Sequence, residues 1–160
     1  MASMRPSVLV VGVDGTSTGQ AALMFAMREA TLRGCALEVV TAWTWDAAYH
    51  PPLGAQPAAV RERAEQAQEA AISAALANTT APPVISRHVV QGEAGPALLE
   101  VARTADYLVV GTEHRNAVAR ALLGSVSRYC MRHATCPVVV VPEARPVVEA
   151  RPEPDLARVP

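Results

Sequence analysis

Residues 107–127 read YLVVGTEHRNAVARALLGSVS, and this stretch decides how the chain is expected to fold. It opens with a short apolar run, Tyr107 to Val110, which ends at Gly111. Gly124 and Ser125 then begin a pattern typical of a helix. The backbone N–H groups at a helix start are free and lie at the positive end of the helix dipole, so they suit a phosphate. The stretch therefore predicts a buried strand, a glycine turn and a helix start that can bind an anion.

Outward from this stretch, apolar runs alternate with helical patterns. Strands are predicted at residues 8–13, 37–41, 84–90, 107–110 and 138–141. Helices are predicted from the capping-box spacing at 17–20 to Gly34, from Pro57 to the prolines at 82–83, from Pro96 to Thr104, and from Ser125 to His133. This alternation is typical of an α/β fold, a doubly wound parallel sheet with right-handed crossover helices.

The composition favours one globular domain. Of the 160 residues, 51% are hydrophobic and 18% are charged, so a sizeable core is expected. The 14 Lys and Arg residues nearly balance the 15 Asp and Glu residues, which gives no reason to expect nucleic acid or a membrane as a partner. The first residues lack a signal-peptide pattern. Residues 1–142 are predicted to form the domain, and the Pro-rich residues 143–160 a disordered tail.

The three cysteines, Cys35, Cys130 and Cys136, are odd in number and show no repeated spacing, which argues against a disulfide framework. A reducing compartment, the cytoplasm, is therefore expected. Cys130, His133 and Cys136 have the spacing C-x2-H-x2-C, but no fourth ligand is evident. We predict that these three are buried structural residues and that they hold no metal.

Two glycine-bearing strand ends are candidate binding positions, because ligands of open α/β sheets bind at the carboxyl ends of the strands. One is Asp14-Gly15 after the first strand, and the other is Gly111 after the fourth. The chain has no G-x4-G-K-[ST] loop, no His-x-Gly-His and no nucleophile paired with a base. An enzyme on this fold is thus the least supported class, and binding without efficient catalysis is expected.

Five motifs carry a resemblance to a known family. They are VGVDGTS (11–17), GEAGPALL (92–99), VVG (109–111), LLGSVS (122–127) and HATCPVVVVP (133–142). In this order they resemble the universal stress protein family over roughly residues 5–142. The resemblance implies a five-stranded sheet of order 3-2-1-4-5, Rossmann-like and similar to nucleotide-binding adenosine hydrolases. It also implies a homodimer and, in one branch, binding of ATP or AMP.

The ATP-binding branch of that family carries the pattern G-x2-G-x9-G-[ST]. Gly111 matches the first glycine and Gly124-Ser125 the last pair, but His114 stands at the middle glycine, preceded by Glu113. A left-handed backbone at His114 would cost ~1–2 kcal/mol, and Glu113 at ~6 Å from a phosphate would add ~2–3 kcal/mol of repulsion before solvent screening. Triphosphate binding is therefore expected to be roughly a hundredfold weaker, which favours AMP or a cyclic or diphosphate form over ATP.

The predicted nucleotide-binding residues follow from the strand ends and the resemblance. They are Val13, Asp14, Gly15, Thr16, Thr41, Ala42, Val110, Gly111, His114, Gly124, Ser125, Val126 and Ser127. Asp14 is predicted to contact the ribose or a nucleotide-bound metal, and the alternative is a turn residue that accepts nearby N–H groups. Thr41 and Ala42 are predicted to meet adenine through backbone atoms, and the Ser125 and Ser127 hydroxyls to donate to phosphate. The expected ligand is AMP, ADP, ATP or cyclic AMP, with or without Mg²⁺.

The last predicted strand, Val138 to Val141, lies at a sheet edge in the implied order. A bare apolar edge strand is an aggregation hazard, and pairing with the same strand of a second subunit would cover it. Val138, Val139, Val140 and Val141 are therefore the predicted homodimer interface. A dimeric scaffold of this fold that has lost ATP binding and acts through protein partners is the alternative function.

Overall fold

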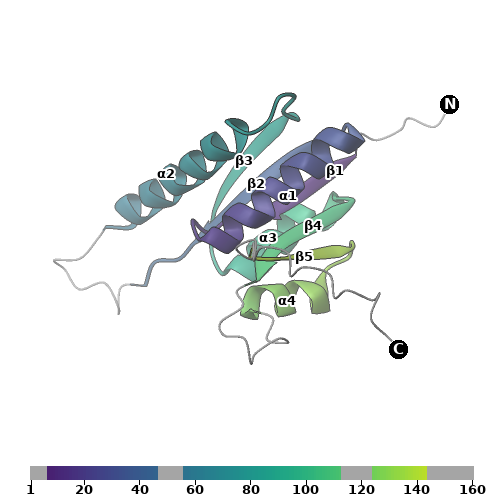
Figure 1. The fold of residues 1–160 in the computed structure, drawn as a ribbon. Coiled ribbons are helices and arrows are strands. Elements are labelled where there is room, and N and C mark those ends of the chain that lie inside the picture. The colour runs from purple at the N-terminus through teal and green to yellow at the C-terminus, as the bar shows by residue number, and fades with distance from the viewer. Residues whose placement is uncertain (1–6, 47–55, 113–123, 144–160) are drawn as a thin grey trace, which may run out of the picture.

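Five parallel strands form one sheet in the order β3-β2-β1-β4-β5 (Figure 1). The computed structural model describes residues 7–46, 56–112 and 124–143. The strands are β1 (Val8–Gly12), β2 (Ala36–Trp43), β3 (Ile85–Gln91), β4 (Tyr107–Thr112) and β5 (Val138–Pro142). The helices are α1 (Ser17–Arg33), α2 (Pro57–Leu76), α3 (Ala94–Val101), which a 3-10 turn (Ala102–Thr104) extends, and α4 (Ser125–His133). The predicted doubly wound α/β fold and its strand order are confirmed.

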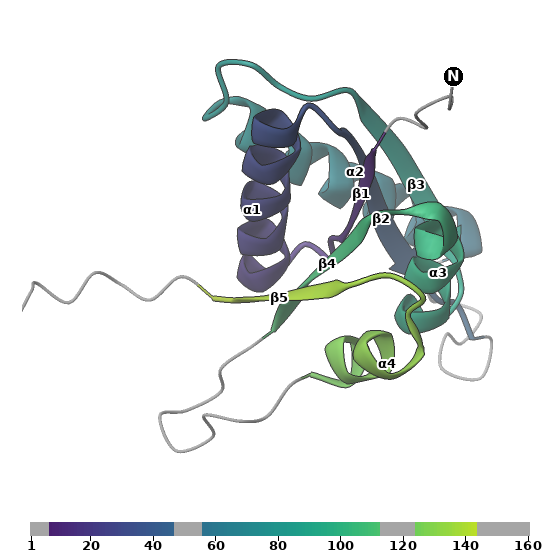
Figure 2. The ribbon, with the colours of Figure 1, turned by 90° about the vertical axis from the view of Figure 1, so that its right-hand side faces the viewer.

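The helices cover the sheet in pairs, with α1 and α2 on one face and α3 and α4 on the other (Figure 2). Side chains alternate along β1: Leu9 and Val11 lie in the core beneath α1, whereas Val10 lies in the core on the α3 side. All three are buried. Because helices cover both faces, β1 reads as a continuous apolar run instead of an alternating one.

Helix α1 begins at the predicted residue but with a different cap. Thr16 is the N-cap, and its hydroxyl oxygen accepts a hydrogen bond from the N–H of Gly19 at 3.1 Å. The predicted capping box at Ser17 to Gln20 is wrong, because the position that would reach back to the cap is Gly19, which has no side chain. Gln20 instead donates to the carbonyl oxygen of Ala71 and so joins α1 to α2.

Helix α3 begins at Ala94, two residues before the predicted start at Pro96. Pro96 is the third residue of the helix, where its missing N–H costs little because first-turn N–H groups have no acceptor within the helix. The predicted end of α1 is confirmed, since Gly34 caps the helix after Arg33.

Strands β1 and β4 are neighbours in the sheet, and the strand order reverses between them. The chain proceeds from β1 to β2 on one side, while β4 lies on the other side. The register pairs Leu9 with Tyr107 and Val11 with Val109. The turns that follow both strands therefore meet at the carboxyl end of the sheet, which is where open α/β sheets bind their ligands.

Strand β5 forms one edge of the sheet, and Val138 to Val141 are each only partly buried. Within the described ranges, no helix is both long enough and apolar enough to span a bilayer. Several predictions fall outside the described residues, namely those on Glu113, on His114 and on the tail beyond Glu143.

Candidate functional site

A pocket of about 100 Å³ opens at the switch point, where β1 and β4 end. Its walls come from the ends of three strands, the first turn of α1, and helices α3 and α4. The lining residues are Gly12, Val13, Asp14, Thr18, Gly19, Val40, Ala42, Ala94, Leu98, Val110, Gly111 and Val126. This volume is below the ~300–1,000 Å³ of pockets that enclose a whole small ligand. The pocket can therefore enclose one ring-sized part of a ligand, with the remainder lying along the strand ends.

Gly111 allows β4 to end directly against the first turn of α1. A Cβ atom at Gly111 would lie 2.5 Å from the carbonyl oxygen of Thr18 and 2.8 Å from its carbonyl carbon. Only glycine permits this approach of the two backbones. The close packing brings Thr18 and Gly19 into the pocket wall beside Val110. Gly111, predicted as a binding residue, thus also has a packing role that shapes the pocket.

Asp14 organises the turn between β1 and α1. Its Oδ1 accepts hydrogen bonds from the backbone N–H of Thr16 at 3.0 Å and from the Thr16 hydroxyl at 2.6 Å. The turn role that the sequence left as an alternative is therefore present. Asp14 is also exposed and lines the pocket, and no described residue donates a hydrogen bond to its Oδ2. One carboxylate oxygen serves the turn, and the other can accept a hydrogen bond from a ligand.

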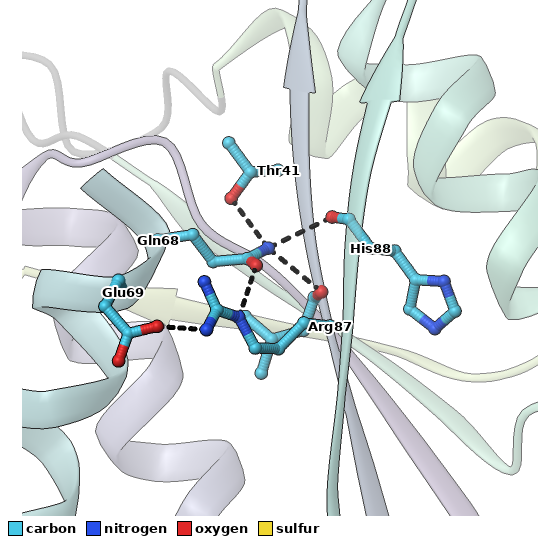
Figure 3. A network of polar contacts seen from close by, with 6 residues as sticks. Thr41, Gln68, Glu69, Arg87 and His88 are labelled. Atoms are coloured by element: carbon cyan, nitrogen blue, oxygen red, sulfur yellow. Dashed lines mark hydrogen bonds and ion pairs between the residues drawn. The ribbon is translucent and has the colours of Figure 1, made fainter. Parts of the chain in front are cut away.

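Thr41 turns its side chain away from the pocket. Side chains alternate along β2, so Val40 and Ala42 line the pocket, whereas Thr41 points toward α2 on the other face. The Thr41 hydroxyl accepts a hydrogen bond from Nε2 of Gln68 at 3.1 Å (Figure 3). Of the two residues predicted to meet the adenine ring, only Ala42 lines the pocket.

Gln68 is the centre of a polar network behind this end of β2 (Figure 3). Its side chain is 0% exposed. Nε2 also donates to the carbonyl oxygens of Val39 at 3.1 Å and His88 at 3.0 Å, while Oε1 accepts from Nε of Arg87 at 3.3 Å. Arg87 in turn pairs with Glu69. The network joins α2 to both β2 and β3 and holds the β2 backbone from the side opposite the pocket.

The start of α4 lies beside the end of β4. Gly124 is the N-cap residue, and within the described structure no side chain caps the first turn. The N–H of Gly124 donates to the hydroxyl of Thr112 at 3.4 Å. Ser127 is buried, and its hydroxyl donates back to the carbonyl oxygen of Gly124 at 3.0 Å. Ser125 is exposed, so of the two predicted phosphate donors its hydroxyl is the accessible one.

The structure brings about half of the predicted binding residues to the pocket. Val13, Asp14, Ala42, Val110, Gly111 and Val126 line it. Gly15, Thr16, Thr41, Gly124, Ser125 and Ser127 do not line it, and His114 lies outside the described residues. The sequence analysis missed Gly12, Thr18, Gly19, Val40, Ala94 and Leu98. The i, i+4 spacing of Ala94 and Leu98 on a helix following a glycine turn could have indicated a shared face toward the site.

A model of the universal stress protein family matches residues 7–142 of the chain. The chain belongs to this family. The resemblance that the five motifs carry is thus confirmed, and the matched range agrees with the expected one.

The chain is also similar to individual members of the universal stress protein family. One from Mycobacterium tuberculosis is 35% identical over 153 aligned positions, which cover 84% of this chain and 48% of that relative. The chain therefore spans about half the length of the curated relatives it matches. A solved universal stress protein in complex with cAMP is 28% identical with a TM-score of 0.57, covering 87% of this chain and 98% of that one. The universal stress protein of Archaeoglobus fulgidus in complex with dAMP is 19% identical, with a TM-score of 0.62 and coverage of 86% and 98%, and shares the fold.

The predicted burial of Cys130, His133 and Cys136 is only partly confirmed. Cys130 is buried and Cys136 partly buried, and burial raises the pKa of the Cys130 thiol to about 11. His133 is exposed, so its predicted burial is wrong. It lies on the outer side of α4, where its ring stacks on Tyr129 at a centroid distance of 4.4 Å. Among the described residues, no three His, Cys, Asp or Glu side chains are placed to hold a metal ion.

Proposed function

We propose that this chain is a stress-response regulatory protein that binds an adenine nucleotide in the pocket at the ends of β1 and β4. The observation that carries the proposal is the position of this pocket, at the switch point between the Asp14 turn and the start of α4. Family membership and the cAMP complex of a 28% identical relative support an adenine nucleotide as the ligand. The candidates are AMP, ADP, ATP and cyclic AMP, with or without Mg²⁺.

Each part of the nucleotide has a matching region of the site. The base is assigned to the apolar wall that Val40, Ala42 and Leu98 contribute. The ribose hydroxyls are assigned to Oδ2 of Asp14. The phosphate is assigned to the N–H groups around Val126, because the positive end of the α4 dipole lies there and no described side chain caps it.

We propose binding without efficient catalysis, because the sequence has no G-x4-G-K-[ST] loop and no nucleophile paired with a base. Asp14 is the one ionisable residue among the described residues that line the pocket. General acid–base or nucleophilic catalysis needs a second group to orient or activate the first. The proposed role is therefore regulatory, with the nucleotide as a signal and not as a substrate that turns over rapidly.

Calorimetry with ATP, ADP, AMP and cyclic AMP, each with and without Mg²⁺, tests this proposal. We expect measurable binding of at least AMP or cyclic AMP. An Asp14→Ala variant should bind about ten- to hundredfold more weakly, since a hydrogen bond to a charged group contributes ~1.5–3 kcal/mol. Absence of binding for all four nucleotides would contradict the proposal and leave the dimeric scaffold that acts through protein partners.

Two residues, Glu113 and His114, favour the alternative function, a dimeric scaffold that has lost ATP binding. These two residues replace the pattern of the ATP-binding branch of the family. The double substitution Glu113→Arg with His114→Gly should strengthen ATP binding by roughly a hundredfold and AMP binding by less, because it removes a negative charge near the outer phosphates. Unchanged ATP affinity would refute this account of the loop.

We further propose a homodimer that pairs β5 with its copy. Val138 to Val141 are partly exposed in the single chain, and β4 is the one described strand that pairs with β5. Leu108 donates to the carbonyl oxygen of Pro137, so alternate residues of β5 bond to β4 and the N–H of Val140 points outward. Val140→Pro should therefore block the dimer without breaking the β4 ladder. Light scattering that shows only monomer for the unmodified protein at micromolar concentration would overturn the dimer.

The proposed compartment is the cytoplasm. All three cysteines are free in the structure, which suits a reducing environment.

A further inference from the structure

Helices α3 and α4 meet at an unusually close contact between Gly95 and Tyr129. Gly95 is buried in the first turn of α3. A Cβ atom on it would lie 2.9 Å from Cγ of the Tyr129 ring and closer still to Cδ1. These atoms belong to the base of the ring and not to a flexible end. Any residue larger than glycine at position 95 must therefore displace either the tyrosine ring or α4 as a whole.

The ring of Tyr129 also contacts the ring of His133 on the same helix. It stacks on the ring of His133, with centroids 4.4 Å apart and an angle of 31° between the planes. Nδ1 of His133 lies 2.9 Å from the carbonyl oxygen of Tyr129, which fixes the histidine on the same turn. Rotation of the partly exposed tyrosine ring would break this pair, whereas movement of α4 would keep it, and we take movement of α4 as the response to added bulk at Gly95.

This contact lies directly behind the pocket. Ala94 and Leu98, which line the pocket from α3, are adjacent to Gly95 and one turn after it. Val126, which lines the pocket from α4, is one turn before Tyr129 and shares its side of the helix. The spacing of Gly95 and Tyr129 therefore sets how far the start of α4 lies from the wall that α3 forms.

We propose that Gly95 and Tyr129 are positioning residues that place the first turn of α4 for the phosphate of the bound nucleotide. The inference rests on the proposed nucleotide function and adds that different elements of the fold position different parts of the nucleotide. The base and ribose regions depend on β1, β2 and α3, whereas the phosphate depends on the separation of α3 and α4. A change in this separation lowers affinity for nucleotides but not for the nucleoside.

The test compares adenosine with AMP in Gly95→Ala, by calorimetry. AMP affinity should fall about tenfold, which corresponds to about 1.4 kcal/mol, while adenosine affinity stays within about twofold. Tyr129→Ala should also lower AMP affinity, because it removes the ring that spaces the two helices. The double variant Gly95→Ala with Tyr129→Ala should bind AMP no more weakly than Tyr129→Ala alone, because the added methyl group then has space. Met131→Ala, an exposed position on the same helix, is the control and should leave both affinities unchanged.

The possible outcomes distinguish failure of the positioning role from failure of nucleotide binding itself. Equal losses for adenosine and AMP, unchanged AMP affinity, or losses that add in the double variant would overturn the positioning role alone. An unmodified protein that binds neither ligand would overturn both proposals. If Gly95→Ala does not fold, Tyr129→Trp adds bulk from the exposed side of the contact. A selective loss of AMP affinity in that variant supports the inference, and unchanged AMP affinity overturns it.

Discussion

The two faces of the sheet differ in what they bury and in what they expose. Beneath α1 and α2 lies the larger core, in which Leu23 and Met27 are at most 1% exposed. The α3 and α4 face buries fewer residues, and much of its apolar surface, including Val90 and Val126, is only partly covered. The pocket opens at the end of this second face. The comparison indicates that the first face supplies most of the buried core and the second face supplies walls of a binding site.

The largest expected effect comes from the same truncation made on each face. Leu23→Ala should reduce the free energy of unfolding by ~3–5 kcal/mol, because it leaves a closed cavity in the larger core. Leu98→Ala should cost less, ~2 kcal/mol, because Leu98 borders a pocket that already exists, and it should weaken adenosine binding. Urea unfolding and calorimetry measure the two effects. Equal losses of stability would contradict the difference between the faces.

Gln68 places a buried polar network within the otherwise apolar first face of the sheet, and removing its amide tests whether this network stabilises that face. Gln68→Met keeps the length of the side chain but removes the polar contacts that its amide makes with Val39, Thr41, His88 and Arg87. The expected loss of unfolding free energy is ~1–3 kcal/mol, since buried partners lose their hydrogen bonds. Gln66→Met is the matched control: Gln66 is exposed on the same helix and should change stability by less than ~0.5 kcal/mol. Similar losses for both variants would show that the network does not stabilise this face.

The thiol of Cys130 gives the second face a dependence on pH. Burial raises the pKa of this thiol from 9.0 to about 11. Because the folded-state pKa is the higher one, this contribution to stability is complete below about pH 9 and is lost as the pH rises to about 11. The loss is at most ~2–3 kcal/mol. Cys130→Ala should remove that part of the alkaline decline in urea-unfolding curves, and identical declines for the two proteins would contradict the account.

The fold could be predicted largely from local signals. Apolar runs marked most of the strands, because a strand buried on both faces has few polar positions. The run at 84–90 is more polar and was marked mainly by the prolines before it and the glycine after it. Helix starts were less certain, since a cap depends on one side chain reaching one N–H group. Thr16 performs that role, although Ser17 fitted the sequence pattern better. The strand order itself came from the family resemblance and not from the runs.

The site could be predicted only where it follows the strand ends. Asp14 and Gly111 were found because the carboxyl ends of β1 and β4 must meet at the switch point. Thr18 was missed because it reaches the pocket through the packing of α1 against the end of β4, which the sequence does not specify. The direction of Thr41 could have been foreseen, since alternation along β2 places it on the face opposite Ala42.

The smallest expected effect concerns Thr16, which belongs to the turn that joins the two regions. Thr16→Ala removes the cap of α1 and should cost ~1 kcal/mol of unfolding free energy. Ser17→Ala is the control, because Ser17 makes an exposed hydrogen bond to Glu143 and does not cap the helix. Thr16 also donates a hydrogen bond to Oδ1 of Asp14. The same variant should therefore also weaken nucleotide binding, because the Asp14 carboxylate loses a contact that orients it. If stability falls and affinity does not change, the Thr16 hydroxyl serves the helix alone. A loss of both stability and affinity in Thr16→Ala, with neither lost in Ser17→Ala, would show that one hydroxyl group caps α1 and orients the binding carboxylate.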